Sequence, residues 1–258
     1  MKVYNIGASY EYSSSTGMNS YDSGRPLLKK LKDHFLKYAN MSLYHEYHWD
    51  GFSRISFTVN NMKNIIFCID LSKNRSFELS VCKTSDAENE NTIARFQPSL
   101  YAKTDGPYRD EDGNAWYSRY TAFKINAFEK DGKLIAFLPH DTITTSADDA
   151  VVFGTDCFGK KYIYIAYANK LYYDAPDYIE HKCDADRLSV SVDGYVYLKK
   201  KICIYKNNAV IATTDTVGII CNTNLGTSTN NTYLNLIDVD GIRYRQLKSN
   251  IWIQDKEE

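Results

Sequence analysis

Several signatures of catalysis and targeting are absent from the 258-residue sequence. It contains no GxSxG nucleophile elbow, and no glycine-rich phosphate loop follows a strand-like run. The first residues, MKVYNIGASYEYSSSTG, lack an apolar core of signal-peptide length, and no apolar run approaches the length of a membrane span. We therefore expect neither secretion by a signal peptide nor insertion into a membrane.

An excess of charge and a disulfide framework are also missing. The formal net charge of −1 at pH 7 gives no overall attraction for nucleic acid or acidic lipid. The six cysteines include no CxxC pair, and four of them lie inside apolar strand-like runs: Cys68, Cys82, Cys203 and Cys221. We therefore expect no nucleic-acid partner, and thiols that are reduced and buried.

The polar clusters that could carry chemistry lack the spacing that such chemistry needs. His45 and His48 are three residues apart and His181 lies close to Cys183, but neither set has the paired spacing of a structural zinc site. The acidic segment 110–114 does not start a calcium loop, because Ala115 occupies the position that needs a glycine and Thr121 the position that needs a glutamate. The paired carboxylates of a glycosidase meet in space rather than in sequence, so the sequence does not decide whether such a pair is present. We predict no catalytic residue, no metal site and no cofactor.

One stretch, Asp22–Tyr44, is typical of an amphipathic helix. Its large apolar residues share one face, and they are Leu27, Leu28, Leu31, Phe35, Tyr38 and Ala39. Asp22 or Ser23 is placed to cap the helix. Because a helix of this length is marginal alone in water, we expect it to pack on a sheet that includes the following hairpin, Phe52–Asp70.

Tyrosine is unusually frequent, with 22 residues. Its ring buries area while its hydroxyl stays hydrated, so tyrosine is favoured in strands and at interfaces. The aromatic clusters could stack on a sugar ring, cover a subunit contact or pack in the core, and we favour core packing or ordinary interface filling. The candidate interface or ligand-stacking aromatics are Trp49, Trp116, Tyr162, Tyr164, Tyr172 and Tyr173.

The rest of the chain alternates strand-like runs with turn dipeptides. The turns that we predict are Asn60-Asn61, Asp112-Gly113, Asp131-Gly132, Asp193-Gly194, Asn207-Asn208 and Asp240-Gly241. Such dipeptides tolerate positive φ angles and match tight hairpin turns. A series of hairpins favours a mainly β fold, a sandwich or barrel of antiparallel strands, over alternating βαβ units. With the single N-terminal helix packed on a sheet, the expected class is β-rich α+β.

The sequence suggests three segments. Residues 1–21 are polar and indicate an N-terminal arm that is ordered against a neighbour. Residues 22–144 form the predicted helix-plus-sheet domain, and residues 145–258 an all-β, hairpin-rich domain. The boundary is placed in the small, polar stretch 142–150, which could equally be one surface loop within a single continuous domain.

A resemblance to a known class of proteins accompanies this pattern. The helix PLLKKLKDHFLKY, the strands FSRISFTVNN and NIIFCIDL, and the ending DGIRYRQLKSNIWI resemble small virion structural proteins of tailed phages and phage-tail-like particles from low-GC hosts. The resemblance concerns the style of the whole chain and carries no functional residue with it. It implies assembly rather than catalysis.

The resemblance leads to a functional expectation. We expect a non-enzymatic structural protein of a phage tail, neck or baseplate, made in the cytoplasm of a bacterial host and located in the particle. Its partners would be other virion proteins and further copies of itself. A carbohydrate- or receptor-binding module at a tail tip is the alternative, motivated by the aromatic clusters, and a cell-wall hydrolase is the third hypothesis.

Overall fold

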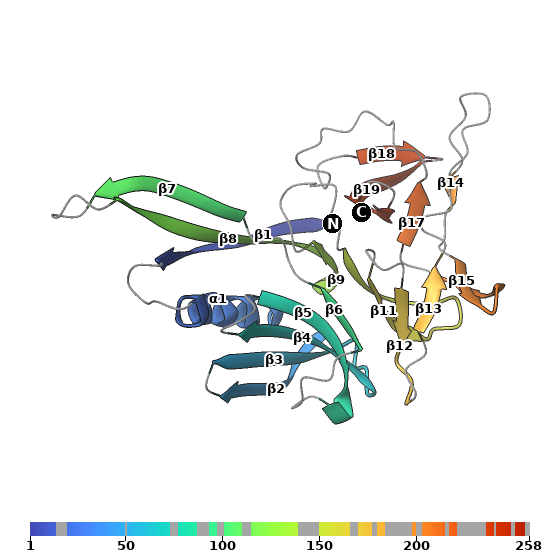
Figure 1. The fold of residues 1–258 in the computed structure, drawn as a ribbon. Helices are drawn as coiled ribbons and strands as arrows, with labels where there is room; N and C mark the ends of the chain where they lie inside the picture. The colour runs from blue at the N-terminus through green and yellow to red at the C-terminus, as the bar shows by residue number, and fades with distance from the viewer. Residues whose placement is uncertain are drawn as a thin grey trace. The chain divides into compact units, whose positions relative to one another are not determined.

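The structure is a computed structural model. It describes residues 1–13, 20–49, 51–72, 77–86, 93–96, 101–109, 115–138, 150–165, 170–176, 180–183, 198–199, 203–214, 217–220, 236–239, 241–248 and 251–255. Antiparallel strands make up most of these residues, and one α-helix is present among them (Figure 1). The predicted class, β-rich α+β, is therefore confirmed.

The chain divides into two compact units. Unit 1 comprises Met1–Tyr4 and Asn126–Glu258, and unit 2 comprises Asn5–Ile125. The chain passes from one unit to the other inside two strands, β1 (Lys2–Ser13) and β8 (Ala115–Lys130), and not in a loop. The predicted boundary stretch 142–149 lies outside the described residues.

The N-terminal segment is more regular than a polar arm. Residues Lys2–Ser13 form strand β1, which pairs with β8. Strand β7 (Tyr101–Arg109) pairs with the first part of β8 in an antiparallel register. The segment assigned as an arm is thus largely strand, because an alternating run of this length can satisfy its backbone groups by pairing with β8.

Unit 2 contains a five-stranded antiparallel sheet in the order β2-β3-β4-β5-β6. Its strands are β2 (Met41–Trp49), β3 (Phe52–Val59), β4 (Ile65–Ser72), β5 (Phe77–Lys83) and β6 (Ala94–Phe96). A short 3-10 helix, η1 (Thr84–Asp86), follows β5. The predicted hairpin over residues 52–70 is confirmed, since β3 and β4 pair from Phe52 opposite Ser72 to Phe57 opposite Phe67.

Helix α1 (Ser20–Phe35) starts earlier and ends earlier than predicted. Asp22 lies inside the helix rather than at its cap, and residues 36–40 form turns before β2 begins. The last turn tightens through backbone hydrogen bonds from Lys37 to His34 and from Tyr38 to Phe35, which close shorter rings than those of an α-helix. Residues 41–44, which we predicted as helix, instead belong to β2: Met41, Ser42 and Leu43 pair with β3, and Tyr44 lies at a bulge. Pairing satisfies the backbone groups, and tertiary contacts override local propensity.

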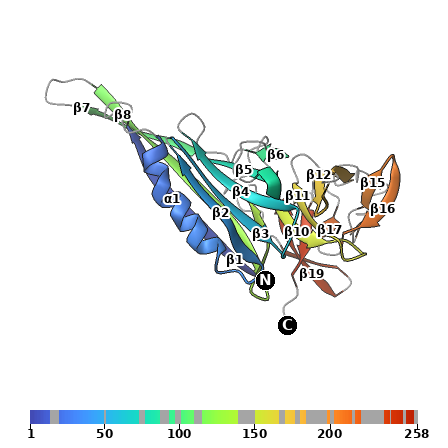
Figure 2. The ribbon, with the colours of Figure 1, turned by 90° about the horizontal axis from the view of Figure 1, so that it is seen from below.

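Most of the described part of the predicted apolar face packs on the sheet. Tyr38 is buried just past the end of α1, but Ala39 is exposed, and the side chain of Leu27 lies outside the described residues. Leu28, Leu31 and Phe35 are almost fully buried, and the Phe35 ring meets the rings of Phe57 and Phe67 at centroid distances of 5.7 and 6.4 Å. Figures 1 and 2 show α1 running along the sheet. Each of these buried side chains contributes about 1.5–3 kcal/mol of stability. Tertiary packing therefore holds the helix.

The other face of the sheet carries a buried ion pair. The Arg54 guanidinium donates to both carboxylate oxygens of Asp70, at 2.7 and 2.8 Å, and the Ser80 hydroxyl donates to the same carboxylate at 3.2 Å. Burial lowers the pKa of Arg54, but the hydrogen bonds and charge of Asp70 outweigh that effect and hold the pKa above its usual value. Because both side chains are nearly excluded from water, the pair depends on its bidentate geometry.

Two thiols lie beside this pair. The Sγ atoms of Cys68 and Cys82 are 3.5 Å apart, and Cys68 donates to Cys82. Burial raises the pKa of Cys68, whereas the hydrogen bond from Cys68 lowers that of Cys82. Both thiols are reduced and buried, which agrees with the expectation for these two residues. Cys203 is reduced but only half-buried, so the expectation of burial is wrong there, and Cys221 lies outside the described residues. Cys157 is also reduced but is exposed.

Unit 1 is built from two antiparallel sheets. One continues from β8 through β9 (Lys133–Leu138), β10 (Val151–Thr155), β11 (Lys161–Ile165), β12 (Lys170–Tyr173), β13 (Glu180–Cys183), β15 (Cys203–Lys206) and β16 (Ala209–Thr213). The other, in the order β14-β17-β20-β19-β18, comprises β14 (Leu198–Lys199), β17 (Val217–Ile220), β18 (Leu236–Val239), β19 (Ile242–Lys248) and β20 (Ile251–Gln254). Its core joins side chains of the larger sheet to Ile253 of β20.

The turn predictions hold wherever the structure describes them. The turn residues with positive φ are Asn60 (54°), Asn61 (54°), Asp131 (54°), Gly132 (73°), Asn207 (51°), Asn208 (65°) and Gly241 (73°). Positive φ suits asparagine, aspartate and glycine more than any other residue, which is why the dipeptides mark these hairpins. The predicted turns at 112–113 and 193–194 lie outside the described residues.

Candidate functional site

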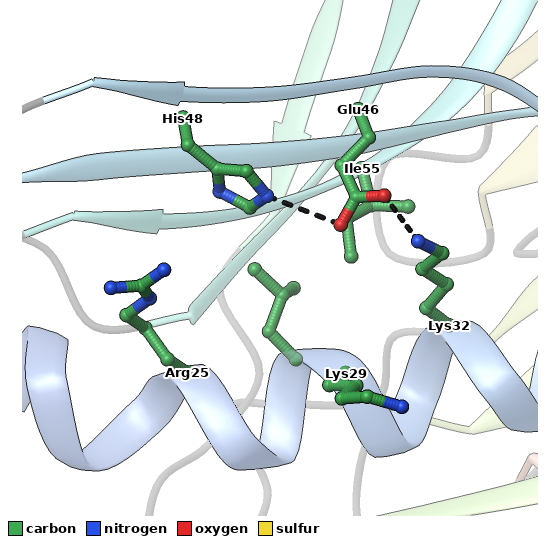
Figure 3. Close-up of a pocket in the computed structure, with 7 residues that line it drawn as sticks. Arg25, Lys29, Lys32, Glu46, His48 and Ile55 are labelled. Carbon is green, nitrogen blue, oxygen red and sulfur yellow. Dashed lines mark hydrogen bonds and ion pairs between the residues drawn. The ribbon is translucent and has the colours of Figure 1, made fainter.

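A cavity of about 590 Å³ opens between α1 and the β2–β3 edge of the unit 2 sheet. Its lining residues are Arg25, Leu28, Lys29, Lys32, Glu46, His48 and Ile55. Figure 3 shows Arg25 and Lys32 extending from the helix toward the strands, with Glu46 and His48 opposite them. We call this site the α1–β2 cavity.

Simple periodicity brings the lining residues together. Arg25, Lys29 and Lys32 lie at positions i, i+4 and i+7 of α1, so they share one face of the helix. Glu46 and His48 are two residues apart on β2 and therefore point to the same side of the sheet. The α1–β2 cavity thus lies between a basic face of the helix and a polar edge strand.

A polar network crosses the cavity from the helix to the edge strand. The Lys32 ammonium forms an ion pair with the Glu46 carboxylate, and the same carboxylate lies 3.1 Å from His48 Nε2. His48 Nδ1 lies 2.8 Å from the Ser53 hydroxyl. Burial raises the pKa of Glu46, but the hydrogen bonds from Lys32 and His48 outweigh burial and lower it below its usual value. Glu46 is therefore an anion that is already bound by the protein.

The remaining cations of the cavity are less neutralised. Lys29 pairs with Asp33 one turn further along α1, at 2.7 Å, and both side chains are exposed. The hydrogen bond with Asp33 raises the pKa of Lys29, and the same bond lowers the pKa of Asp33. Arg25 is exposed and has no ion-pair or hydrogen-bond partner among the described residues. Three cations therefore face one carboxylate within the lining.

An aromatic row occupies the opposite side of the same edge strand. Tyr47 and Trp49 alternate with the cavity residues, so they point to the other face of the sheet. The Trp49 ring stacks on Phe52 with a centroid distance of 4.7 Å and an interplanar angle of 22°. Trp49 is 37% exposed, so one indole face is held by Phe52 while the residue remains in contact with solvent.

The six aromatic candidates differ in how far their side chains are exposed to solvent. Tyr162, Tyr164, Tyr172 and Tyr173 are all buried in unit 1, and the Tyr173 hydroxyl donates to the buried carboxylate of Asp156 at 2.7 Å. We assign these four tyrosines to the core, since a buried ring offers no face to a ligand. Trp116 lies in β8, and its side chain is outside the described residues. Trp49 is the candidate whose described side chain reaches the surface.

The metal and membrane findings apply to the described residues only. No group of three or more His, Cys, Asp or Glu residues among them is placed to hold a metal ion. His45 and His48 point to opposite faces of β2, because they are an odd number of residues apart. In the part of the chain that the structure describes, no helix is both long and apolar enough to cross a membrane.

The α1–β2 cavity was not predicted from the sequence. The sequence analysis assigned no role to Arg25, Lys29 or Lys32, and Glu46 and His48 carried no recognised motif. The available signal was the alternation of Glu46 and His48 on an edge strand that follows a basic helix. The alternation indicates a site only once the position of the helix over this edge of the sheet is known.

Comparison with known proteins yields no relative: no family model, no curated protein and no solved structure matches the chain.

Proposed function

We propose that the chain is a non-enzymatic structural protein of a phage virion or phage-tail-like particle. In this proposal it is made in the bacterial host, enters the tail, neck or baseplate, and binds copies of itself or neighbouring virion proteins. The supporting observation is the exposed edge strand β2, which ends its sheet and carries apolar side chains toward solvent. The virion context comes from the sequence resemblance, and the contact surface from the structure.

The β2 edge has the properties of a strand that another chain covers. Leu43, Tyr44 and Trp49 are 42%, 44% and 37% exposed. Terminal strands present one row of backbone groups that can pair with a further strand, and soluble proteins commonly protect them with charge, proline or bulges. β2 has a bulge between Leu43 and His45 but no proline and no lysine. Aromatic residues on such an edge favour a protein contact.

We expect the purified chain to self-associate, and Leu43→Lys with Trp49→Lys to shift it toward the monomer by at least about ten-fold in dissociation constant. Lysine adds a charge that strand addition would have to bury. The measurement is light scattering coupled to size-exclusion chromatography over a concentration series. Val210→Lys is the matched control, because Val210 is 54% exposed on β16, the terminal strand of a different sheet.

Two results together would contradict the proposal. One is a chain that stays monomeric at the highest soluble concentration. The other is the absence of the chain from purified particles by mass spectrometry. If Val210→Lys dissociated the oligomer and the β2 variants did not, assembly would stand but the contact would not lie at β2.

A carbohydrate-binding module at a tail tip is the second candidate, favoured by Trp49. The Trp49 indole stacks on Phe52, meets the Tyr47 ring edge-on at a centroid distance of 3.7 Å and is partly exposed, so these aromatic residues together offer a preordered surface for a sugar ring. We expect a glycan array to give signals that Trp49→Ala lowers by about ten-fold, with Tyr44→Ala as the control on the same strand. A blank array, or signals that Trp49→Ala leaves unchanged, contradicts this candidate.

A further inference from the structure

We propose that the α1–β2 cavity binds an organic anion, a molecule with a phosphate or carboxylate group and an apolar portion. The cavity, its excess of cations and its apolar floor support this site. The proposal goes beyond assembly and does not depend on it, because the cavity residues and Trp49 lie on opposite faces of the sheet.

The size and lining of the cavity suit a small molecule. A volume of about 590 Å³ falls within the range of roughly 300–1,000 Å³ that is common for such sites. Leu28 and Ile55, which are 2% and 1% exposed, give the cavity an apolar floor. An inorganic ion would leave most of the cavity volume unfilled, whereas an apolar group attached to the anion would occupy it and lie against this floor.

Arg25 is the cation best placed to bind the anionic group. Its side chain is exposed at the cavity and has no partner among the described residues, so within that part of the chain binding would break no ion pair. The guanidinium presents a planar fork of N–H donors that matches a carboxylate or a phosphate. Figure 3 shows Arg25 and Lys32 at different points along the helix side of the cavity, so an anion held by Arg25 leaves room for an apolar group.

Among the described residues that line the cavity, Glu46 is the only carboxylate, and its contacts limit its repulsion of a ligand. Lys32 pairs with it from the helix, and His48 lies against its other oxygen. Asp33, which pairs with Lys29, is not part of the lining. Even when Asp33 is counted with the lining, the cations exceed the carboxylates by one.

The test measures binding by isothermal titration calorimetry with four probes. Phenyl phosphate and benzoate combine an anionic group with an apolar ring, benzyl alcohol keeps the ring without the charge, and inorganic phosphate keeps the charge without the ring. We expect saturable binding of phenyl phosphate or benzoate, at least about ten-fold tighter than either single-feature probe. The tighter of the two aromatic anions identifies the preferred anionic group.

Three single substitutions should change the binding affinity in different ways: one should weaken binding, one should tighten it, and one should leave it nearly unchanged. Arg25→Gln should weaken binding by roughly ten-fold or more, because a charge-assisted hydrogen-bond partner is lost. Glu46→Gln should tighten binding by about three-fold, because a negative charge leaves the cavity and Lys32 is released toward the ligand. Lys37→Gln removes the same charge as Arg25→Gln from an exposed position outside the lining, and should change affinity by less than about two-fold.

Circular dichroism of each variant establishes that it is folded. A substitution that only disturbed the structure would weaken binding, whereas Glu46→Gln should tighten it. The proposal is overturned if neither aromatic anion binds saturably, or if benzyl alcohol binds as tightly as they do. It is equally overturned if Arg25→Gln and Lys37→Gln have the same effect. None of these outcomes bears on self-association through β2, which the light-scattering experiment measures separately.

Discussion

Replacing Asp70 with alanine should lower the free energy of unfolding by about 3–5 kcal/mol. The substitution leaves the Arg54 guanidinium buried, 1% exposed, without the carboxylate that binds it at 2.7 and 2.8 Å. It also removes the acceptor of the Ser80 hydroxyl. An uncompensated buried charge costs more than a buried pair contributes, which is why the loss of one partner is expected to be severe. Urea denaturation followed by circular dichroism measures the effect.

Two further variants separate this explanation from a general loss of packing. The double substitution Arg54→Met with Asp70→Leu should recover most of the lost stability, because it removes both charges and refills the space. Asp238→Ala breaks an exposed ion pair with Arg243, at 3.3 Å, and should cost less than about 1 kcal/mol. If Asp70→Ala cost no more than Asp238→Ala, the buried pair would not contribute to the stability of unit 2.

The second large effect is expected in helix α1, where Phe35→Asp should abolish soluble folding. Phe35 is fully buried between α1 and the sheet, with its ring against Phe57 and Phe67. Removing the ring alone costs about 3–5 kcal/mol, and a buried carboxylate without a partner adds to that loss. A small domain has a total stability of roughly 5–15 kcal/mol, so little would remain.

Soluble expression and the far-UV circular dichroism spectrum measure this result. Leu31→Asp should behave in the same way, since Leu31 is also fully buried. Lys30→Ala is the control on the exposed side of the same helix and should fold normally. Soluble, native-like Phe35→Asp protein would show that α1 is dispensable for the folding of the sheet.

Much of the architecture could be predicted because it follows local rules. The hairpin around Asn60 and Asn61 combines an alternating strand before the turn, an apolar strand after it and a turn that tolerates positive φ, and each of these signals spans only a few residues. Helical periodicity alone predicted the buried positions Leu28, Leu31 and Phe35 of α1. It did not predict the C-terminal limit of α1, because residues 41–43 pair with a strand whose position no local pattern encodes.

The candidate sites were less predictable because they depend on distant residues. Trp49 and Tyr162 are both aromatic residues in strands, yet one is 37% exposed and the other fully buried. The difference arises because β2 ends its sheet, whereas β11 lies between β10 and β12. Position within a sheet decides which faces and edges reach solvent, and that position is set by strand order, which no single strand encodes.

Periodicity and turn chemistry in the sequence thus determine the β-rich class, the hairpins and the buried face of the helix, since each depends on neighbours only a few residues apart. Strand order and helix placement decide the rest. They bring Lys32 to Glu46 across 14 positions, and the basic face of α1 to the polar side of β2. Such pairings arise from the packing of whole elements, whose free energy is summed over many contacts, so only the tertiary structure reveals them.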